Sequence, residues 1–325
     1  MKHYAFKGIL QNNGWLENIA ITIDRDGIIV DIEQVNENEV DTGYALPGFQ
    51  NAHSHAFQYA MAGLAEKHDA DSKNGDFWSW REAMYRLALH ISPDQLEDIA
   101  TMLYAEMVRH GYTSVAEFHY VHHDKSGKPY DNLAEMGSRL VAAAETAGIN
   151  ITLVPIFYQK GGFGVAPNER QKRFISSSVD DYMKLLDASQ SVCKYYKGAN
   201  IAIGMHSMRG VEPKHISEIA QFGPQNLPFH IHVSEQLKEI EDSIEYLGKR
   251  PVEWLAENVA LSERFHLVHA THLTENETAT IAQSGANVVL CPTTEGNLGD
   301  GIFPLRKYQE LGGQWSIGTD SHVSL

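Results

Sequence analysis

The sequence is poor in cysteine, and it lacks a long apolar run. Only two of its 325 residues are cysteines, Cys193 and Cys291. Two thiols this far apart make neither a disulfide scaffold nor a thiolate metal site, so we expect both to be reduced and buried. No apolar run reaches the ~18 residues that a membrane span needs, and residues 1–4 lack the apolar core of a secretory signal. We therefore expect a cytoplasmic protein with no membrane partner.

Basic residues are also scarce. The chain has 26 Lys and Arg against 42 Asp and Glu, which gives a formal net charge of −16. Nucleic acids and anionic membranes bind basic surfaces, so this balance excludes both as partners. A small anionic substrate held by a few arginines stays compatible with it. The content of 43% hydrophobic and 21% charged residues is close to the globular average, which excludes a disordered chain.

The first 46 residues differ from the rest. Alternating apolar runs at 19–23 and 28–32 flank Asp26-Gly27, a pair typical of a tight hairpin turn. This pattern predicts a small antiparallel β domain over residues 1–46.

From residue 47 onward, strand and helix patterns alternate, which indicates a parallel sheet covered by helices. One expected strand ends near His53, and the others are residues 113–119, 151–157, 201–206, 229–233, 265–269, 288–291 and 315–319. Capping-box patterns at Ser92 and Thr274 predict helix starts, and residues 159–178 are expected to form a long loop. Eight strands favour an α/β fold of the (β/α)8 TIM-like barrel type over residues 47–325. A doubly wound open sheet is the alternative.

The sequence ends five residues after Asp320, with no pattern for an eighth helix. A barrel should cover its last strand, and the N-terminal β unit is too small to be stable alone. We therefore expect a barrel truncated after the eighth strand, in a shortened chain or a fragment.

Histidine is abundant, with 17 residues, and its positions indicate chemistry. His53 and His55 end one expected strand, and residues two apart on a strand point to the same side. His232, His269 and Asp320 follow or end three other expected strands. Each alone has a simpler explanation, as a hydrogen-bonded core histidine or a turn residue. Because the carboxyl ends of barrel strands converge on one face, the set predicts a site for Zn²⁺, with Fe²⁺ as the alternative.

Pro47-Gly48-Phe49 running into His53-Ser54-His55, with the later His232, His269 and Asp320, resembles the amidohydrolase superfamily. The resemblance implies a barrel of the amidohydrolase type and the metal ligands His53, His55, His232 and Asp320. It places His269 close to the metal-bound water. Two-metal members usually carry a carboxylated lysine at the end of the fourth strand, where residues 203–207 have none, so one divalent ion is expected.

Glu235 lies three residues after His232, and this His-x-x-Glu spacing is similar to that of the one-metal deaminases. In them the glutamate carries protons to the nitrogen that leaves as ammonia. By this resemblance the catalytic residues are Glu235, His269 and Asp320.

Residues 49–58, 60–63, 77–81, 117–120 and 206–209 are similar to the N-formimino-L-glutamate deiminases of bacterial histidine degradation. That family hydrolyses N-formimino-L-glutamate to N-formyl-L-glutamate and ammonia. Carried over from it, the substrate-binding residues are Gln58, Arg81, Tyr120, His206 and Arg209.

The chemistry of such a dicarboxylate substrate calls for guanidinium groups, which bind carboxylates through two hydrogen bonds. Arg81 and Arg209 are both expected in loops that follow strands, on the face that carries the metal residues. From the residues alone, either arginine could instead pack on a surface, and Tyr120 could be a strand-end aromatic. His119, His122 and His123 are expected to be polar loop groups or groups that support the metal ligands, not a second metal site.

Two other functions remain open from the sequence. One is a metal-dependent aminohydrolase of a nucleobase, a nucleoside or an S-adenosyl compound, and the other is a non-catalytic barrel that acts as a binding module. A small-molecule dicarboxylate is the expected partner, and a homodimer is the expected assembly.

Overall fold

The computed structural model describes residues 1–63 and 75–321. The chain divides into two compact units, Met1–Phe49 and Gln50–Leu325, whereas the sequence predicted this boundary after residue 46. Within the described residues, no helix combines the length and apolar character that crossing a membrane requires.

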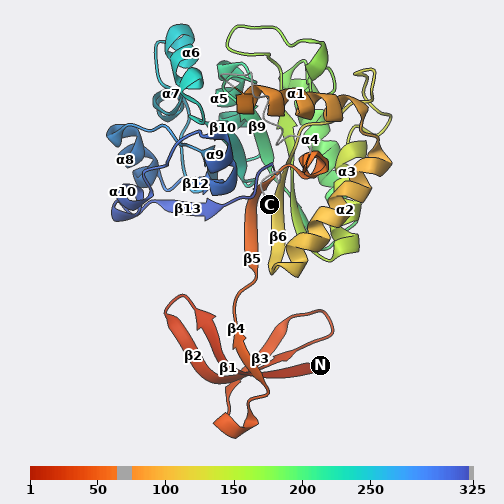
Figure 1. The fold of residues 1–325 in the computed structure, drawn as a ribbon, viewed down its shortest axis with the longest axis vertical. Helices are drawn as coiled ribbons and strands as arrows, with labels where there is room; N and C mark the ends of the chain where they lie inside the picture. Colours follow the sequence, from red (N-terminus) through yellow and green to blue (C-terminus); the bar gives the residue numbers. More distant parts are fainter. Residues whose placement is uncertain (64–74, 322–325) are drawn as a thin grey trace. The chain divides into compact units, whose positions relative to one another are not determined.

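The N-terminal unit is a four-stranded sheet in the order β3-β2-β1-β4 (Figure 1). Its strands are β1 (Lys2–Gln11), β2 (Gly14–Ile23), β3 (Ile29–Gln34) and β4 (Thr42–Ala45), with the short 3₁₀ turn η1 (Glu37–Glu39) before β4. Strands β1, β2 and β3 are antiparallel, and β4 runs parallel to β1. The Asp24 carboxylate accepts the amides of Asp26 and Ile28, and Gly27 takes a φ of 82°, so the expected turn joins β2 to β3.

The second unit is a barrel whose strands follow the order β5-β6-β7-β9-β10-β11-β12-β13. They are β5 (Phe49–Ser54), β6 (Tyr112–His119), β7 (Asn150–Phe157), β9 (Ile203–Ser207), β10 (Phe229–Val233), β11 (Phe265–His269), β12 (Asn287–Leu290) and β13 (Gln314–Ile317). The pairs from β6 to β13 are parallel. The predicted strand at 201–206 is in fact two, because β8 (Ala199–Ile201) pairs with β7 before β9 begins.

The last strand returns to the first and closes the ring. The amides of Thr319 and Asp320 donate to the His53 carbonyl oxygen at 3.0 and 2.9 Å, and the His55 amide donates to the Asp320 carbonyl oxygen at 3.1 Å. Gly318 permits this approach, because a Cβ atom there would lie 2.6 Å from the His53 Cβ atom. The (β/α)8 prediction is confirmed, and the open-sheet alternative is wrong.

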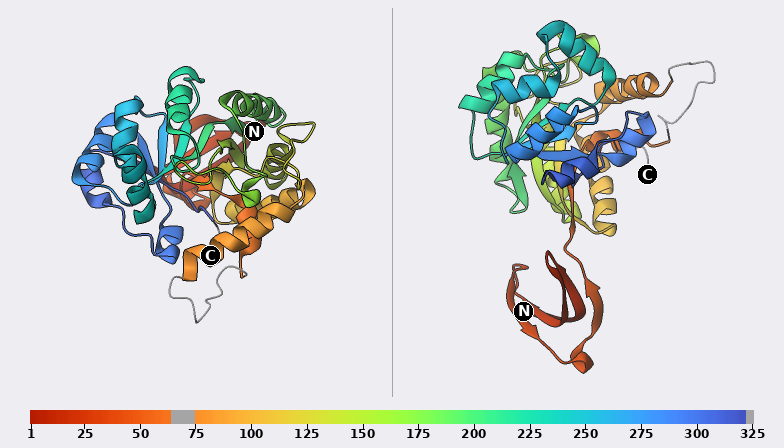
Figure 2. Two further views of the ribbon diagram at one scale, coloured as in Figure 1. Left: turned by 90° about the horizontal axis from the view of Figure 1, so that it is seen from above. Right: turned by 90° about the vertical axis from the view of Figure 1, so that its left-hand side faces the viewer.

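Helices surround the strands when the barrel is viewed from above (Figure 2). They are α1 (Gly75–His90), α2 (Pro93–Arg109), α3 (Glu135–Ala147), α4 (Val179–Cys193), α5 (Pro213–Phe222), α6 (Leu237–Leu247), α7 (Pro251–Asn258), α8 (Glu275–Ser284), α9 (Pro292–Leu298) and α10 (Leu305–Glu310). Two 3₁₀ segments, η2 (Ala56–Met61) and η3 (Glu169–Gln171), interrupt the connections. The second lies inside the predicted loop 159–178.

Local sequence sets several helix starts. Ser92 accepts the Gln95 amide at the start of α2, and Thr274 accepts the Glu277 amide at the start of α8, so both predicted capping boxes are confirmed. Apolar side chains of the strands and helices form the main core. Cys193 and Cys291 are buried and free, as expected.

Candidate metal centre and active site

Four potential ligands meet at the carboxyl ends of β5, β10 and β13. His53 Nε2 lies 3.1 Å from His55 Nε2 and 3.1 Å from His232 Nε2. Asp320 Oδ1 lies 3.2 Å from His53 Nε2 and 3.1 Å from His55 Nε2. All four side chains are buried. Ligand atoms of a tetrahedral ion with bonds of about 2.0–2.1 Å lie roughly 3.3 Å apart, so the spacing fits one ion.

The outer hydrogen bonds of two imidazoles favour this fit. His55 Nδ1 contacts the Phe118 carbonyl oxygen at 2.7 Å, and His232 Nδ1 contacts the His206 carbonyl oxygen at 2.8 Å. A carbonyl only accepts, so each Nδ1 carries the proton and each Nε2 keeps a lone pair. Both lone pairs point toward His53 Nε2, an arrangement that a shared cation stabilises. The donor set therefore fits a divalent metal.

The electrostatics of the cluster agree with cation binding. Burial lowers the pKa of His53 to about 4 and holds that of His232 well below its usual range, so both imidazoles are neutral near pH 7. Burial opposes ionisation of Asp320, but its contacts with the His53 and His55 rings outweigh burial and hold the pKa of this carboxyl well below its usual range. Neutral imidazoles and one carboxylate are the forms that ligate a metal ion.

Glu117 supports the metal-bearing turn, a role that the sequence analysis missed. Its buried carboxylate accepts the Ser54 hydroxyl at 2.7 Å and the Ala56 amide at 2.6 Å. These partners flank His55 on both sides. Burial raises the pKa of Glu117 to about 7. Its place near the end of an expected strand and within the family-like residues 117–120 gave no hint of this role, because the partners lie more than 60 positions earlier in the chain.

His269 lies beside the cluster, with its ring centroid 5.4 Å from that of His232. Its Nδ1 lies 3.2 Å from Glu295 Oε1, and its Nε2 lies 3.8 Å from Glu235 Oε1. Burial disfavours the imidazolium, but the carboxylates of Glu235, Glu295 and Asp320 outweigh it and raise the pKa of His269 to about 10. Sequence reasoning also missed Glu295, which lies on α9.

The backbone is strained at these strand ends. Ser234, His269, Ala270 and Asp320 all have positive φ angles, between 49° and 69°. Residues other than glycine seldom adopt this conformation, and such strain gathers at functional sites.

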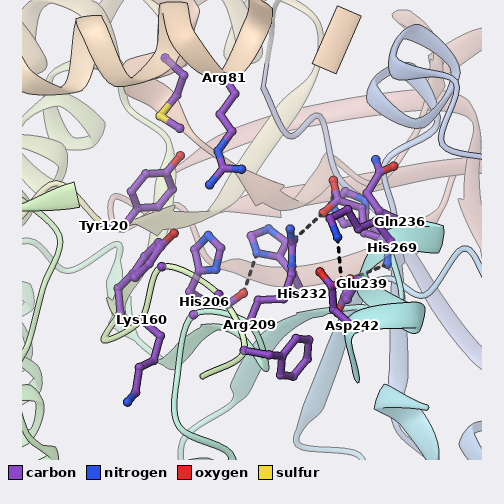
Figure 3. A pocket seen from close by; sticks show the side chains of 18 of the residues that line it. Arg81, Tyr120, Lys160, His206, Arg209, His232, Gln236, Glu239, Asp242 and His269 are labelled. Carbon is purple, nitrogen blue, oxygen red and sulfur yellow. Dashed lines mark hydrogen bonds and ion pairs between the residues drawn. The ribbon is translucent and has the colours of Figure 1, made fainter. Parts of the chain in front are cut away.

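A cavity of about 850 Å³ opens over the cluster (Figure 3). It brings together all the residues that the sequence assigned to catalysis and substrate binding: Gln58, Arg81, Tyr120, His206, Arg209, Glu235, His269 and Asp320. His55 and His232 also line it. Residues of the wall that the sequence did not single out include Tyr85, Tyr158, Lys160, Phe174 and Glu239.

The sequence predicted Arg81 in a loop after a strand. Arg81 lies instead on helix α1. Its guanidinium Nη2 donates to the Tyr85 hydroxyl one turn later at 3.0 Å. The side chain still reaches the cavity, as Figure 3 shows. The aromatic residues before Arg81 show no strand or turn pattern. Phe77, Trp80 and Met84 lie three and four positions apart, a helical spacing that the prediction overlooked.

Arg209 follows β9 as predicted, and its Nη2 lies 3.3 Å from Glu235 Oε2. Gln58 donates to the Tyr120 hydroxyl at 2.8 Å, while its own side-chain oxygen is buried with no hydrogen-bond partner among the described residues. The His206 ring lies 4.1 Å from that of Tyr158, centroid to centroid. Burial holds the pKa of His206 well below its usual range, so the imidazole that lines the cavity is neutral.

The other histidine cluster has a structural explanation. His122 Nε2 lies 3.0 Å from the Ile156 carbonyl oxygen, and His123 Nε2 lies 2.8 Å from that of Ile175. Within the described part of the chain, neither they nor His119 belong to a group that could hold a metal.

Comparison with known proteins agrees with this geometry. Residues 44–325 match the Amidohydrolase family. The chain is 47% identical over 316 residues to the formimidoylglutamate deiminase of Pseudomonas aeruginosa, covering 96% of this chain and 69% of that protein. It is 26% identical over 311 residues to a 5-methylthioadenosine/S-adenosylhomocysteine deaminase of Halobacterium salinarum, covering 94% of this chain and 65% of that one.

Among solved structures, an amidohydrolase from Brucella melitensis superposes with a TM-score of 0.93 at 44% identity, over 99% of this chain and 72% of that chain. A zinc-bound adenosine deaminase from Xanthomonas campestris shares the fold, with a TM-score of 0.79 at 21% identity, over 99% and 69% of the two chains. The chain belongs to the amidohydrolase family and, within it, to the formimidoylglutamate deiminases, which makes it a metal-dependent hydrolase acting on carbon–nitrogen bonds.

Proposed function

We propose that this chain hydrolyses N-formimino-L-glutamate to N-formyl-L-glutamate and ammonia. The observation that carries the proposal is one cavity in which two arginines face a cluster of three histidines and an aspartate, with Glu235 between them. The similarity to a formimidoylglutamate deiminase over most of the chain supports the choice of substrate.

The four clustered side chains, His53, His55, His232 and Asp320, would hold one divalent ion, which we propose to be Zn²⁺. Bound there, Zn²⁺ supplies an activated water, because it lowers the pKa of such a water to about 7. Fe²⁺ accepts the same nitrogen and oxygen ligands and is the alternative. Metal analysis of the purified chain decides between them.

Proton transfer falls to the residues around the cluster. Asp320 accepts the proton of the attacking water, and the His269 ring orients that water by donating a hydrogen bond to it. The Glu235 carboxylate then carries protons to the substrate nitrogen, which leaves as ammonia, and general acid–base catalysis of this kind contributes about 10²–10⁴-fold. The 3.8 Å between Glu235 Oε1 and His269 Nε2 supports a shared proton path.

Cationic and polar side chains of the cavity wall recognise the substrate. Arg81 and Arg209 bind the two carboxylates of the substrate, since guanidinium groups offer two parallel donors. Gln58, Tyr120 and neutral His206 complete the contacts. A planar nucleobase offers no carboxylate for either guanidinium group to bind, and this disfavours the aminohydrolase alternative.

An ammonia-release assay tests the proposal. We expect the zinc-loaded chain to act on N-formimino-L-glutamate at a kcat/KM at least 100-fold above that for adenosine, guanine or S-adenosylhomocysteine. A preference for any of these three would overturn the substrate assignment. Folded, zinc-loaded protein that releases no ammonia from any of them would favour a binding module.

A further inference from the structure

Helix α6 carries a buried carboxylate that no step of the proposed mechanism uses. Glu239 has a relative exposure of 1% and lies in the cavity wall (Figure 3). It is not among the clustered metal residues. A buried carboxylate is costly unless hydrogen bonds satisfy it, so its partners indicate its purpose.

Both oxygens of Glu239 accept backbone amides from the strand end that bears Glu235. Oε1 accepts the Ser234 amide at 3.2 Å, and Oε2 accepts the Glu235 amide at 3.1 Å. Ser234 has a φ of 52°, a left-handed conformation that a serine adopts only when its surroundings impose it. The carboxylate therefore holds a strained peptide that sets the direction of the Glu235 side chain.

Ordinary helix capping does not explain this pattern. Glu239 is the third residue of α6, where a capping glutamate would accept the amide of the N-cap residue, Gln236. Its side chain instead reaches past Gln236 to the two preceding residues. The contacts thus serve the β10 end and not the first turn of the helix.

The charge of Glu239 also bears on Arg209. Arg209 follows β9, and its guanidinium lies 3.3 Å from Glu235 Oε2. Burial disfavours the charged form of this arginine, but the neighbouring carboxylates of Glu239 and Glu235 outweigh that effect and raise its pKa. Burial also raises the pKa of Glu239, while Arg209 opposes that rise. The Glu239 carboxylate thus fixes the backbone of Glu235. It also balances the charge of Arg209, which the Glu235 side chain contacts.

We propose that Glu239 is a positioning residue for deimination: by holding the Ser234–Glu235 backbone beside Arg209, it keeps the Glu235 carboxylate between Arg209 and His269. This inference deepens the proposed function, and its kinetic consequences rest on that function. The positioning of the Glu235 backbone by Glu239 rests on the hydrogen bonds alone.

The test compares E239A and E239Q with wild type and with E241Q, a control for an exposed glutamate on the same helix. For E239A we expect about one zinc per chain, a kcat lowered about 10²-fold and a KM changed less than about 3-fold, because a misplaced proton carrier slows chemistry more than binding. E239Q keeps one acceptor oxygen, so its kcat should lie between those of E239A and wild type. The pH profile of kcat should shift in E239A, which a loss of stability alone would not cause.

A kcat for both variants within 3-fold of wild type, or a large rise of KM at unchanged kcat, would overturn the inference. If E239A does not fold, E239Q carries the comparison. If wild type is inactive on N-formimino-L-glutamate, the proposed function fails, and a crystal structure of E239Q then decides the positioning role. A Glu235 carboxylate displaced by about 1 Å or more supports it, since such a shift is enough to impair catalysis, and an unmoved carboxylate refutes it.

Discussion

The Glu235 carboxylate lies between the Arg209 guanidinium on one side and the His269 ring on the other. Its two oxygens lie 3.3 Å from Arg209 Nη2 and 3.8 Å from His269 Nε2. It lies near the metal cluster without belonging to it.

We therefore expect Glu235→Gln to keep about one metal ion per chain and to lose about 10²–10⁴-fold in kcat, because an amide cannot carry the proton. Metal analysis and steady-state kinetics on the same sample check this. Ammonia release within a few-fold of wild type would remove Glu235 from proton transfer.

Arg209 serves two partners, and its replacement should have two effects. Arg209→Met removes the guanidinium that we assign to a substrate carboxylate, so KM should rise about 10- to 100-fold, the cost of losing a charged hydrogen bond. The Glu235 carboxylate also loses its cationic partner, so kcat should fall as well. Saturation kinetics separate the two effects, and a KM equal to that of wild type would place Arg209 outside the substrate site.

At the scale of single elements, the approach of β13 to β5 depends on Gly318, which has no side chain. An alanine Cβ at position 318 would lie 2.6 Å from the His53 Cβ atom and 2.9 Å from the His53 carbonyl oxygen. Since backbone cannot yield as a flexible side chain does, Gly318→Ala should destabilise the fold by about 1–3 kcal/mol and reduce zinc retained after dialysis. Gly43→Ala is the control, because a Cβ there meets nothing within 4 Å. Equal zinc content and equal urea midpoints in the two variants would contradict the closure argument.

What the sequence could predict at this scale follows from periodicity and caps. Short apolar strands, such as Phe229–Val233 and Phe265–His269, were predicted to the residue. The two capping boxes marked helix starts because both partners lie within four residues. The potential metal ligands could be expected to converge because parallel strands end on the same face.

Two other site features could not be predicted because their partners are distant in the chain: Glu117 accepts the Ala56 amide, and Glu295 contacts the His269 imidazole. The partners of Glu239 are near in the chain, but its contacts with Ser234 and Glu235 do not follow the capping-box pattern. Nothing in their local sequence distinguishes them from exposed glutamates. Arg81 was assigned to the correct cavity but to the wrong element, since the resemblance gives a role without a conformation.

For the whole molecule, buried histidines set the response to acid. Several imidazoles outside the metal cluster are neutral in the folded state. Burial lowers the pKa of His119 to about 3 and of His266 to about 4, and holds those of His122, His206 and His230 well below their usual range. In the unfolded chain each should titrate near 6.5. Between about pH 6.5 and 4 the unfolded state thus binds more protons at these imidazoles. Glu117 and Asp300, with pKa values raised to about 7, act in the opposite direction. The imidazoles outnumber these two carboxyls, so stability falls as the pH falls.

Urea midpoints measured at pH 7, 6 and 5 check this expectation. Each such imidazole contributes up to about 1.4 kcal/mol per pH unit in this window. His269, with its pKa raised to about 10, adds a constant amount below pH 6.5 and does not change the slope. A midpoint that stays level from pH 7 to 5 would show that these rings are not held neutral.

Metal removal should also act on the whole fold, because the four clustered residues join β5, β10 and the end of β13. An ion present at about 1,000 times its Kd adds about 4 kcal/mol, so chelation should lower Tm by roughly 10 °C. Readdition of Zn²⁺ should restore Tm, whereas Ca²⁺ should not, because it prefers oxygen ligands. Calorimetry with and without chelator measures this, and an unchanged Tm would speak against a bound ion.

The pairing of the first and last barrel strands also has a consequence for the time that the chain needs to fold during synthesis. The hydrogen bond from Asn51 to Thr319 spans 268 positions of the chain, and a ribosome adds about 5–20 residues per second. On the order of 10 s or more must therefore pass between synthesis of the first imidazoles and of the carboxylate that completes their set. During that interval the nascent barrel has exposed strand edges and an incomplete set of metal ligands, so the full set forms only after the last barrel strand and Asp320 have been synthesised.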